Sequence, residues 1–324
     1  MKQKVLVTRA IFPEAIAALS ERFEVVGNPD DMPWSPDQIA QKLAGCEAAM
    51  STVMCRFDAS VFERNPQLKV VSNIAVGYNN IDVAAATKQG VRVTNTPGVL
   101  DDTTADLTWA LLMAAARRIP EGDAYVRRGD WKVAFAMQSF LGMDIHHATL
   151  GIIGMGRIGQ AIARRALGFD MTVLYNNRTR LPQADEKRCN ATLVDRDELL
   201  ARSDFVVVMA PYSPATHHLI GAAEIAKMKR TAILVNTARG GIVDDAALVQ
   251  ALKDKRIVGA GLDVFEGEPK LNAEYFALPN VALTPHVGSA SRATRLRMCL
   301  TAIANLTAVL EGRVPPNLVN KDVI

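Results

Sequence analysis

The sequence predicts an α/β protein of two domains, each built on a parallel sheet with crossover helices. Its 324 residues exceed the usual size of a single hydrophobic core. Short runs rich in β-branched residues alternate with Ala-rich helical stretches along nearly the whole chain. Because each connection between strands contains a helix, we expect the strands to lie parallel.

The first strand–helix series runs from the N-terminus to about residue 94. A helix over residues 13–21 begins at Pro13, a residue favoured in the first helical turn. A long helix is predicted from Asp101 to Arg118, because acidic and hydroxyl residues open it and two arginines close it, as the helix dipole favours. Strands are predicted at four apolar runs, over residues 4–8, 47–53, 69–74 and 91–94.

A second series follows a less regular stretch over residues 119–147. It starts at Thr149 and continues to about residue 285. The last helix, over about 290–311, has no strand of its own. We therefore expect it to pack back on the first domain.

Composition narrows the classes of function. The chain has 37 basic and 34 acidic residues and a formal net charge of +3, a balance that argues against a dedicated nucleic-acid surface. No apolar stretch reaches the ~20 residues that span a bilayer, and the N-terminus does not resemble a signal peptide. We therefore expect a cytoplasmic protein that binds neither membrane nor nucleic acid.

The cysteines are too far apart in sequence for a zinc cluster or a redox pair, so we expect reduced thiols and no metal. They are Cys46, Cys55, Cys189 and Cys299.

A glycine motif indicates a dinucleotide site. The apolar run Thr149–Ile153 leads into Gly154-x-Gly156-x-x-Gly159, and an Ala-rich helix follows. Gly154 permits a tight turn, Gly156 lets the backbone approach a pyrophosphate, and Gly159 lets helix and strand pack closely. Within this motif, Arg157 and Ile158 are also expected to contact the cofactor.

The end of the next strand bears on the choice of cofactor. The strand Met171–Tyr175 is followed by Asn177, Arg178, Thr179 and Arg180, where an NAD-specific site has an acid that binds the ribose hydroxyls. Arginine can instead pair with a 2′-phosphate, so the sequence favours NADP(H), with NAD(H) left open. The alternative is that these arginines are solvated surface charges.

Three further strand ends each carry one ionisable side chain: Arg239, Glu268 and His286. Ligands bind beyond the carboxyl ends of parallel strands, so these three side chains can meet at one site. Arg can hold a carboxylate and polarise a ketone, and a protonated His can supply a proton to the developing alkoxide. A neighbouring Glu orients the ring and favours its charged form. This set suits the reduction of a 2-keto acid.

At this point the chain resembles the D-isomer-specific 2-hydroxyacid dehydrogenases, a family that includes glyoxylate/hydroxypyruvate, 2-ketogluconate, phosphoglycerate and formate enzymes. The resemblance covers essentially the whole chain. It rests on five motifs: Gly154–Gly159, Asn236–Gly240, Gly261–Phe265, Glu268-Pro269 and Pro285–Gly288.

The resemblance implies roles for individual residues. Arg239, Glu268 and His286 match the catalytic Arg, Glu and His. The substrate carboxylate is expected at the backbone N–H groups of Val76 and Gly77, with Met54, Arg56 and Arg239 also at the substrate site. Further cofactor contacts are expected from Thr104, Pro211, Thr216, Thr237, Ala238, Asp263, His286 and Gly288.

The resemblance also implies an architecture of two Rossmann-like domains. A flavodoxin-like substrate-binding domain is expected over residues 1–100 and 286–324, with an NAD(P)-binding Rossmann domain over 101–285 inserted into it. Members of this family usually form dimers, and residues 119–147 are our candidate dimer arm.

Within the family, Asp144–His147 and the turn at Asn177 and Arg178 resemble the glyoxylate/hydroxypyruvate and 2-ketogluconate reductases. We therefore expect reduction of glyoxylate, hydroxypyruvate or 2-ketogluconate. Formate dehydrogenase is disfavoured because it pairs Gln, not Glu268, with its His. A phosphoglycerate dehydrogenase, which normally has a ribose-binding acid, and a dinucleotide-sensing corepressor remain the alternatives.

Overall fold

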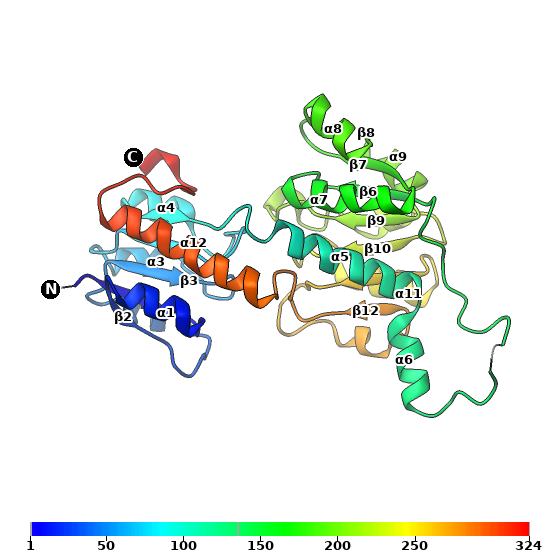
Figure 1. The fold of residues 1–324 in the computed structure, drawn as a ribbon, viewed down its shortest axis with the longest axis horizontal. Coiled ribbons are helices and arrows are strands. Elements are labelled where there is room, and N and C mark those ends of the chain that lie inside the picture. The colour runs from blue at the N-terminus through cyan, green and yellow to red at the C-terminus, as the bar shows by residue number, and fades with distance from the viewer. Residues whose placement is uncertain (1, 135, 324) are drawn as a thin grey trace. The chain divides into compact units, whose positions relative to one another are not determined.

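The computed structural model describes residues 2–134 and 136–323 and divides into two compact units. The first unit comprises the chain up to Leu100 and from Ala290 onward, and the second comprises Asp101–Ser289. Each unit is built on a parallel sheet, of five and seven strands respectively, which confirms the predicted α/β class (Figure 1).

The first sheet has the order β2-β1-β3-β4-β5. Its strands are β1 (Lys4–Val7), β2 (Glu24–Val26), β3 (Ala48–Ser51), β4 (Val70–Asn73) and β5 (Arg92–Thr94). Its helices are α1 (Pro13–Ser20), α2 (Pro36–Lys42), α3 (Ala59–Glu63), α4 (Val83–Lys88), α12 (Arg292–Leu310) and the 3₁₀ turn η4 (Lys321–Val323). β2 is not predicted by the sequence, because a three-residue, incompletely buried edge strand shows little alternation.

Alternating side chains of the first sheet build a core on each of its faces. Val5 and Val7 face one way and pack with α1 and α12, whereas Leu6 faces the other way and packs with α2, α3 and α4. The final helix therefore covers the sheet of the first unit, as Figure 1 shows with α12 in orange.

The second sheet has the order β12-β11-β10-β9-β6-β7-β8. Its strands are β6 (Thr149–Ile153), β7 (Thr172–Asn176), β8 (Ala191–Leu193), β9 (Phe205–Val208), β10 (Ile233–Asn236), β11 (Gly259–Leu262) and β12 (Val281–Leu283). Its α-helices are α5 (Asp101–Ala116), α6 (Ile119–Arg127), α7 (Arg157–Ala166), α8 (Gln183–Cys189), α9 (Arg196–Arg202), α10 (Ala222–Ile225) and α11 (Asp245–Lys253). Its 3₁₀ turns are η1 (Leu167–Phe169), η2 (Pro214–Thr216) and η3 (Ala273–Ala277).

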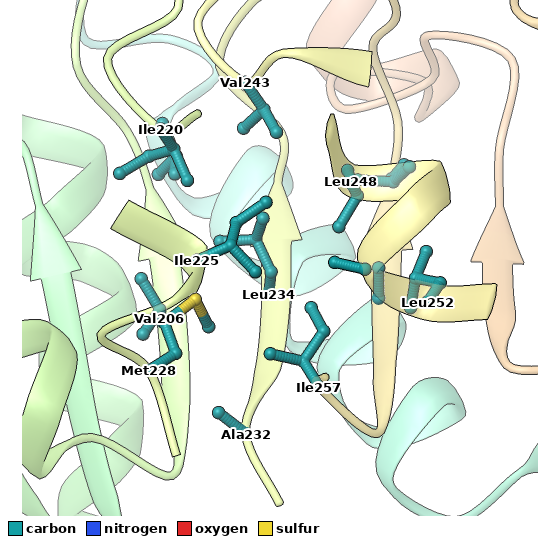
Figure 2. Close-up of a cluster of buried hydrophobic side chains, with 14 of the residues drawn as sticks. Val206, Ile220, Ile225, Met228, Ala232, Leu234, Val243, Leu248, Leu252 and Ile257 are labelled. Carbon is teal, nitrogen blue, oxygen red and sulfur yellow. The ribbon is translucent and has the colours of Figure 1, made fainter. Parts of the chain in front are cut away.

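This sheet is also buried on both faces. On one face, Leu234 of β10 packs among apolar residues of the α10 and α11 segments, including Ile225 and Leu248 (Figure 2). On the other face, α5 and α7 supply a core that includes Trp109 and Ile162. All four residues of β9 are buried, which is typical of an interior parallel strand.

The order of strands fixes where a ligand can bind. The chain leaves β6 towards β7 and β8, then returns to β9 on the other side of β6. Connections therefore leave the carboxyl ends of β6 and β9 in opposite directions, and in open parallel sheets this reversal is where ligands bind. The glycine motif follows β6, so it lies at this reversal.

The segment over residues 119–147 is more regular than predicted at its start. It contains α6, with Pro120 in the first helical turn, while the left-handed backbone of Arg118 (φ 55°) separates α6 from α5. Beyond α6 the chain exposes large apolar side chains, which are Trp131, Val133, Met137 and Leu141.

Two simpler observations complete the description. All four cysteines are buried free thiols. Among the described residues, no helix is long and apolar enough to cross a membrane.

Candidate active site

The glycine turn after β6 has the local geometry of a dinucleotide site. Gly154 adopts φ +102°, and a Cβ atom there would lie 2.5 Å from the backbone nitrogen of Ala210. A Cβ atom on Gly159 would lie 2.5 Å from the carbonyl oxygen of Gly154. The fold itself therefore requires these two glycines, the first for the turn and the second for the approach of α7 to β6.

Gly156, the N-cap of α7, differs because no close contact explains it. Its φ of −75° is open to other residues, and among the described residues no atom lies within 4 Å of a Cβ atom built there. A ligand that lies directly against the backbone of Gly156 explains why this residue has no side chain. The first turn of α7 directs its free N–H groups toward the same ligand position. The residues present therefore fit the pyrophosphate of a dinucleotide.

The turn after β7 places one cation free in solvent. Arg178 is exposed and makes no hydrogen bond or ion pair within the part of the chain that the structure describes. Asn177 accepts a hydrogen bond from the backbone N–H of Met155 at 2.7 Å, which ties the turn to the glycine motif. Arg180 is placed differently from our expectation, because its guanidinium pairs with both carboxylate oxygens of Glu186, at 2.9 and 3.0 Å.

Arg239 lies just beyond β10 in a turn that Asn236 holds. The side chain of Asn236 donates to the carbonyl of Arg239 at 3.0 Å and accepts from the N–H of Ala238 at 3.1 Å. Burial lowers the pKa of Arg239, and the charge of Glu268 opposes this shift. A guanidinium remains charged at any physiological pH, so Arg239 is a fixed cation of the site.

Gly240 is fixed by close packing next to Arg239. A Cβ atom on Gly240 would lie 1.8 Å from the carbonyl oxygen of Phe265, so only glycine fits between the two turns. This approach brings the Arg239 turn against the segment that carries Glu268.

Glu268 and His286 form a close pair. Oε2 of Glu268 lies 2.7 Å from Nδ1 of His286, and Oε1 accepts from the N–H of Phe265 at 2.8 Å. Burial raises the pKa of Glu268, but the hydrogen bond and charge of His286, the Phe265 amide and the charge of Arg239 outweigh it, so the pKa lies below its ordinary value. Glu268 is therefore ionised, and it leaves Nε2 as the ring atom available to a substrate.

The backbone of His286 is held in a strained conformation. Its φ of 53° lies in the left-handed region, which costs non-glycine residues of order 1–3 kcal/mol. Asp263 holds the loop in place: its Oδ1 accepts from the N–H of Val287 at 2.7 Å, and its Oδ2 accepts from the N–H of Gly288 at 2.8 Å. The Thr284 hydroxyl also donates to Asp263, at 2.6 Å.

Asp263 itself is buried. Burial raises its pKa, although its hydrogen bonds and the charge of His286 oppose the shift. Both carboxylate oxygens of Asp263 thus accept hydrogen bonds from the loop that carries His286. Asp263 therefore positions this loop, a role that the sequence does not show.

Other predicted cofactor residues gather around this loop in the second unit. Thr104 is buried, and a Cβ atom on Gly288 would lie 3.4 Å from its methyl group. The hydroxyls of Thr108 and Thr237 lie 2.7 Å apart, which joins α5 to the Arg239 turn. Thr216 donates to the carbonyl of Pro211 at 2.8 Å and thereby closes the loop after β9.

A histidine pair ties that loop to the Glu268 segment. His218 Nε2 lies 3.1 Å from a carboxylate oxygen of Glu266, and His217 stacks on His218 with ring centroids 3.9 Å apart and planes 22° apart. These three residues bring possible metal-ligand atoms within 4.8 Å of one another. However, an ion in the plane of one ring would lie well outside the nearly parallel plane of the other. The cluster is therefore a hydrogen-bonded brace and not a built metal site.

The predicted substrate loop lies in the first unit, after β4. The amides of Asn73 and Asn95 donate to the carbonyls of Gly77 and Val76, each at 2.8 Å. Among the described residues, nothing accepts from the N–H groups of Val76 and Gly77. These two donors are thus held in place and available to an anion. Met54 and Arg56, at the end of β3, are exposed. Asn95 is a residue that the sequence does not point to, since only the fold brings it to this loop.

Comparisons with known proteins agree with this geometry. The model of the family "D-isomer specific 2-hydroxyacid dehydrogenase, NAD binding domain" matches residues 109–288. A glyoxylate reductase of Thermococcus onnurineus is 50% identical over 327 residues, covering 100% of this chain and 98% of that protein.

Two solved structures are also similar. A protein from Polaromonas that is described as a D-isomer specific 2-hydroxyacid dehydrogenase has 38% sequence identity to this chain and a TM-score of 0.92. The match covers 99% of this chain and 100% of the Polaromonas chain. An NADPH-dependent glyoxylate/hydroxypyruvate reductase from Sinorhizobium meliloti, solved with NADP and malonate, has 31% identity and a TM-score of 0.89, covering 100% and 98%. This chain therefore belongs to the D-isomer specific 2-hydroxyacid dehydrogenase family.

Proposed function

We propose that this enzyme reduces glyoxylate and related small 2-keto acids, such as hydroxypyruvate and 2-ketogluconate, to 2-hydroxy acids, with NADPH as the preferred hydride donor. The observation that carries the proposal is the Glu268–His286 pair, 2.7 Å between Oε2 and Nδ1, beside the charge of Arg239. The glyoxylate reductases of Thermococcus and Sinorhizobium named above support the choice of substrate.

We assign the cofactor to the second unit. Residues Gly154–Gly159 and the N-terminus of α7 would hold the pyrophosphate, and Arg178 and Thr179 would meet the 2′-phosphate. The remaining contacts would come from Thr104, Pro211, Thr216, Thr237, Ala238, Asp263 and Gly288. When bound, the reduced nicotinamide supplies a hydride to the carbonyl carbon of the substrate.

The chain's own side chains complete the reaction. Arg239 pairs with the substrate carboxylate and polarises the ketone. Nε2 of His286 would donate its proton to the carbonyl oxygen of the substrate. The ring is left neutral and regains a proton from solvent, while Glu268 on Nδ1 keeps the ring oriented.

We propose that the first unit contributes the backbone N–H groups of Val76 and Gly77 to binding of the substrate carboxylate. Two amide donors held by Asn73 and Asn95 form a small anion site without a charged side chain. Met54 and Arg56 at the neighbouring strand end are the residues that we assign to discrimination among keto acids.

We also propose a homodimer formed through residues 119–147. The described part of this segment exposes Trp131, Val133 and Met137, each more than half accessible, and exposed apolar side chains grouped in this way are typical of an interface. Light scattering of the purified protein should give a mass of twice the 35.1 kDa chain mass. The substitution Trp131→Glu should lower the measured mass toward that of a monomer.

A substrate panel tests the activity. Glyoxylate, hydroxypyruvate, 2-ketogluconate and phosphohydroxypyruvate are each assayed with NADPH and with NADH by absorbance at the nicotinamide band. We expect turnover of glyoxylate that is faster with NADPH at subsaturating cofactor. Binding of NADPH without turnover of any keto acid would favour a dinucleotide-sensing protein instead. A preference for phosphohydroxypyruvate with NADH would favour a phosphoglycerate dehydrogenase.

A further inference from the structure

A buried carboxylate lies directly behind the turn that carries Arg178. Glu186, on α8, has a side chain that is only 9% exposed. Its Oε1 accepts from the hydroxyl of Tyr175 at 2.5 Å, and its two oxygens take the guanidinium of Arg180 in a bidentate pair. The hydrogen bonds of Arg180 and Tyr175 hold the pKa of Glu186 below its ordinary value, so this carboxylate is charged.

These contacts fix the far end of the turn. The hydroxyl of Tyr175, which donates to Glu186, also accepts from the backbone N–H of Leu181 at 3.0 Å. Tyr175 is fully buried in β7, so it carries the rigidity of the sheet to the end of the loop. Glu186 therefore holds Arg180 by a direct ion pair. It holds Leu181 indirectly, through the hydroxyl of Tyr175.

The near end of the same turn is fixed independently. Asn176 donates to the carbonyl of Val194 at 2.9 Å, and Asn177 accepts from the N–H of Met155 at 2.7 Å. Between the two anchors, Arg178 and Thr179 are exposed and have no hydrogen-bond partner among the described residues. A short loop anchored at both ends loses less entropy when its centre binds a ligand.

We propose that Glu186 is a positioning residue for cofactor selection, which presents Arg178 to the 2′-phosphate of NADPH and keeps Arg180 out of that contact. The inference rests on the proposed function in its preference for NADPH. Without the Glu186 charge, Arg180 is released and the loop must be ordered when NADPH binds. NADH lacks the 2′-phosphate, so its binding does not depend on where Arg178 lies.

Titrations of cofactor binding test this inference without turnover. Dissociation constants for NADPH and NADH are measured by cofactor fluorescence for the wild type, Glu186→Gln and Glu198→Gln. The last variant breaks an exposed Arg–Glu pair on α9 of the same unit and serves as the matched control. Gln keeps the size of Glu186 and an acceptor for Tyr175 but removes the charge that holds Arg180.

The expected result is selective. Released side chains must be ordered when NADPH binds, so the dissociation constant of NADPH should rise roughly 3- to 10-fold in Glu186→Gln, a change of about 0.6–1.4 kcal/mol. That of NADH should change less than about 2-fold, and Glu198→Gln should match the wild type. In the Arg178→Ala background, Glu186→Gln should have no further effect on NADPH binding, since the residue through which it acts is gone.

Three results would overturn the inference. These are an equal loss of NADPH and NADH affinity in Glu186→Gln, tighter NADPH binding in that variant, or a wild type that binds both cofactors equally. If Glu186→Gln does not fold, Tyr175→Phe removes the Leu181 anchor without a change of charge and is judged by the same criteria. Failure of the keto-acid panel would instead refute the proposed substrate and leave these binding constants unchanged.

Discussion

Oε2 of Glu268 lies 2.7 Å from Nδ1 of His286, and this contact joins the turn after β11 to the turn after β12. It ties one nitrogen of the ring to a carboxylate and leaves the other for chemistry. The two turns are also locked together by Asp263, whose backbone carbonyl accepts from the N–H of His286 at 2.9 Å. The pair is therefore held in place by contacts within the chain.

Glu268→Gln should slow the reduction. The carboxylate of Glu268 holds Nδ1 of His286, and Gln keeps the size of that side chain but removes its charge. A hydrogen bond to a charged group contributes about 1.5–3 kcal/mol, so kcat/KM for glyoxylate should fall roughly 10-fold or more. Steady-state kinetics measure this loss, and the dissociation constant of NADPH should stay near that of the wild type. Unchanged glyoxylate kinetics would reduce Glu268 to a structural role.

The same variant should also change the pH dependence of stability. The pKa of Glu268 is depressed in the folded protein, so its ionised form stabilises the fold above the ordinary carboxyl range. That contribution is lost as the pH falls through the depressed pKa. Denaturant unfolding should therefore show the wild type more stable than Glu268→Gln near neutral pH, with the difference shrinking in acid. A difference that grows in acid would contradict this sign.

Arg239→Lys should impair use of the keto acid and spare the cofactor. Lysine keeps the charge but cannot pair bidentately with a carboxylate, and loss of one charge-assisted hydrogen bond costs about 1.5–3 kcal/mol. We expect kcat/KM for glyoxylate to fall roughly 10- to 150-fold, while the dissociation constant of NADPH stays near that of the wild type. Unchanged glyoxylate kinetics would remove Arg239 from the substrate site.

Arg178→Ala should raise the KM for NADPH by about 10-fold or more, because one guanidinium–phosphate contact contributes about 1.5–3 kcal/mol. The KM for NADH should hardly change. Arg202→Ala, at an exposed arginine on α9 of the same unit, is the matched control. Equal losses for both cofactors would show that Arg178 does not meet a phosphate.

The glycines of the motif should respond differently to alanine. Gly159→Ala places a methyl group 2.5 Å from the carbonyl oxygen of Gly154, so it should destabilise the fold by about 1–3 kcal/mol. Gly156→Ala meets no atom of the described residues within 4 Å, so it should cost less stability than Gly159→Ala, limited to the loss of a favoured N-cap residue, while weakening dinucleotide binding. Normal NADPH binding by folded Gly156→Ala would argue against a ligand at this backbone.

The sequence predicted well those features that depend on local patterns. The α/β class, the strand before Gly154 and the long helix from Asp101 follow from periodicity, glycine spacing and helix-end residues. The left-handed turn at Arg118 and the helix after it leave weaker local signals, so the sequence predicts an irregular stretch there.

Features that depend on contacts between distant residues could not be predicted. Arg180 was expected at the phosphate, but its partner Glu186 lies on the next helix, and only the fold shows their pairing. Asn95 reaches the substrate loop from a neighbouring strand end. Asp263 holds Val287 and Gly288, near the end of the second unit at Ser289, and the sequence alone does not show these contacts.

The most direct test of the account is single-turnover reduction of glyoxylate by His286→Ala with saturating NADPH. Loss of the general acid should slow turnover on the order of 10²–10⁴-fold. NADPH should still bind, since the glycine turn and Arg178 are untouched, and any loss of affinity from the missing His286 contact should be small beside the loss of rate. Near wild-type turnover in a folded His286→Ala protein that still binds NADPH would mean that another group supplies the proton and would contradict the proposed mechanism.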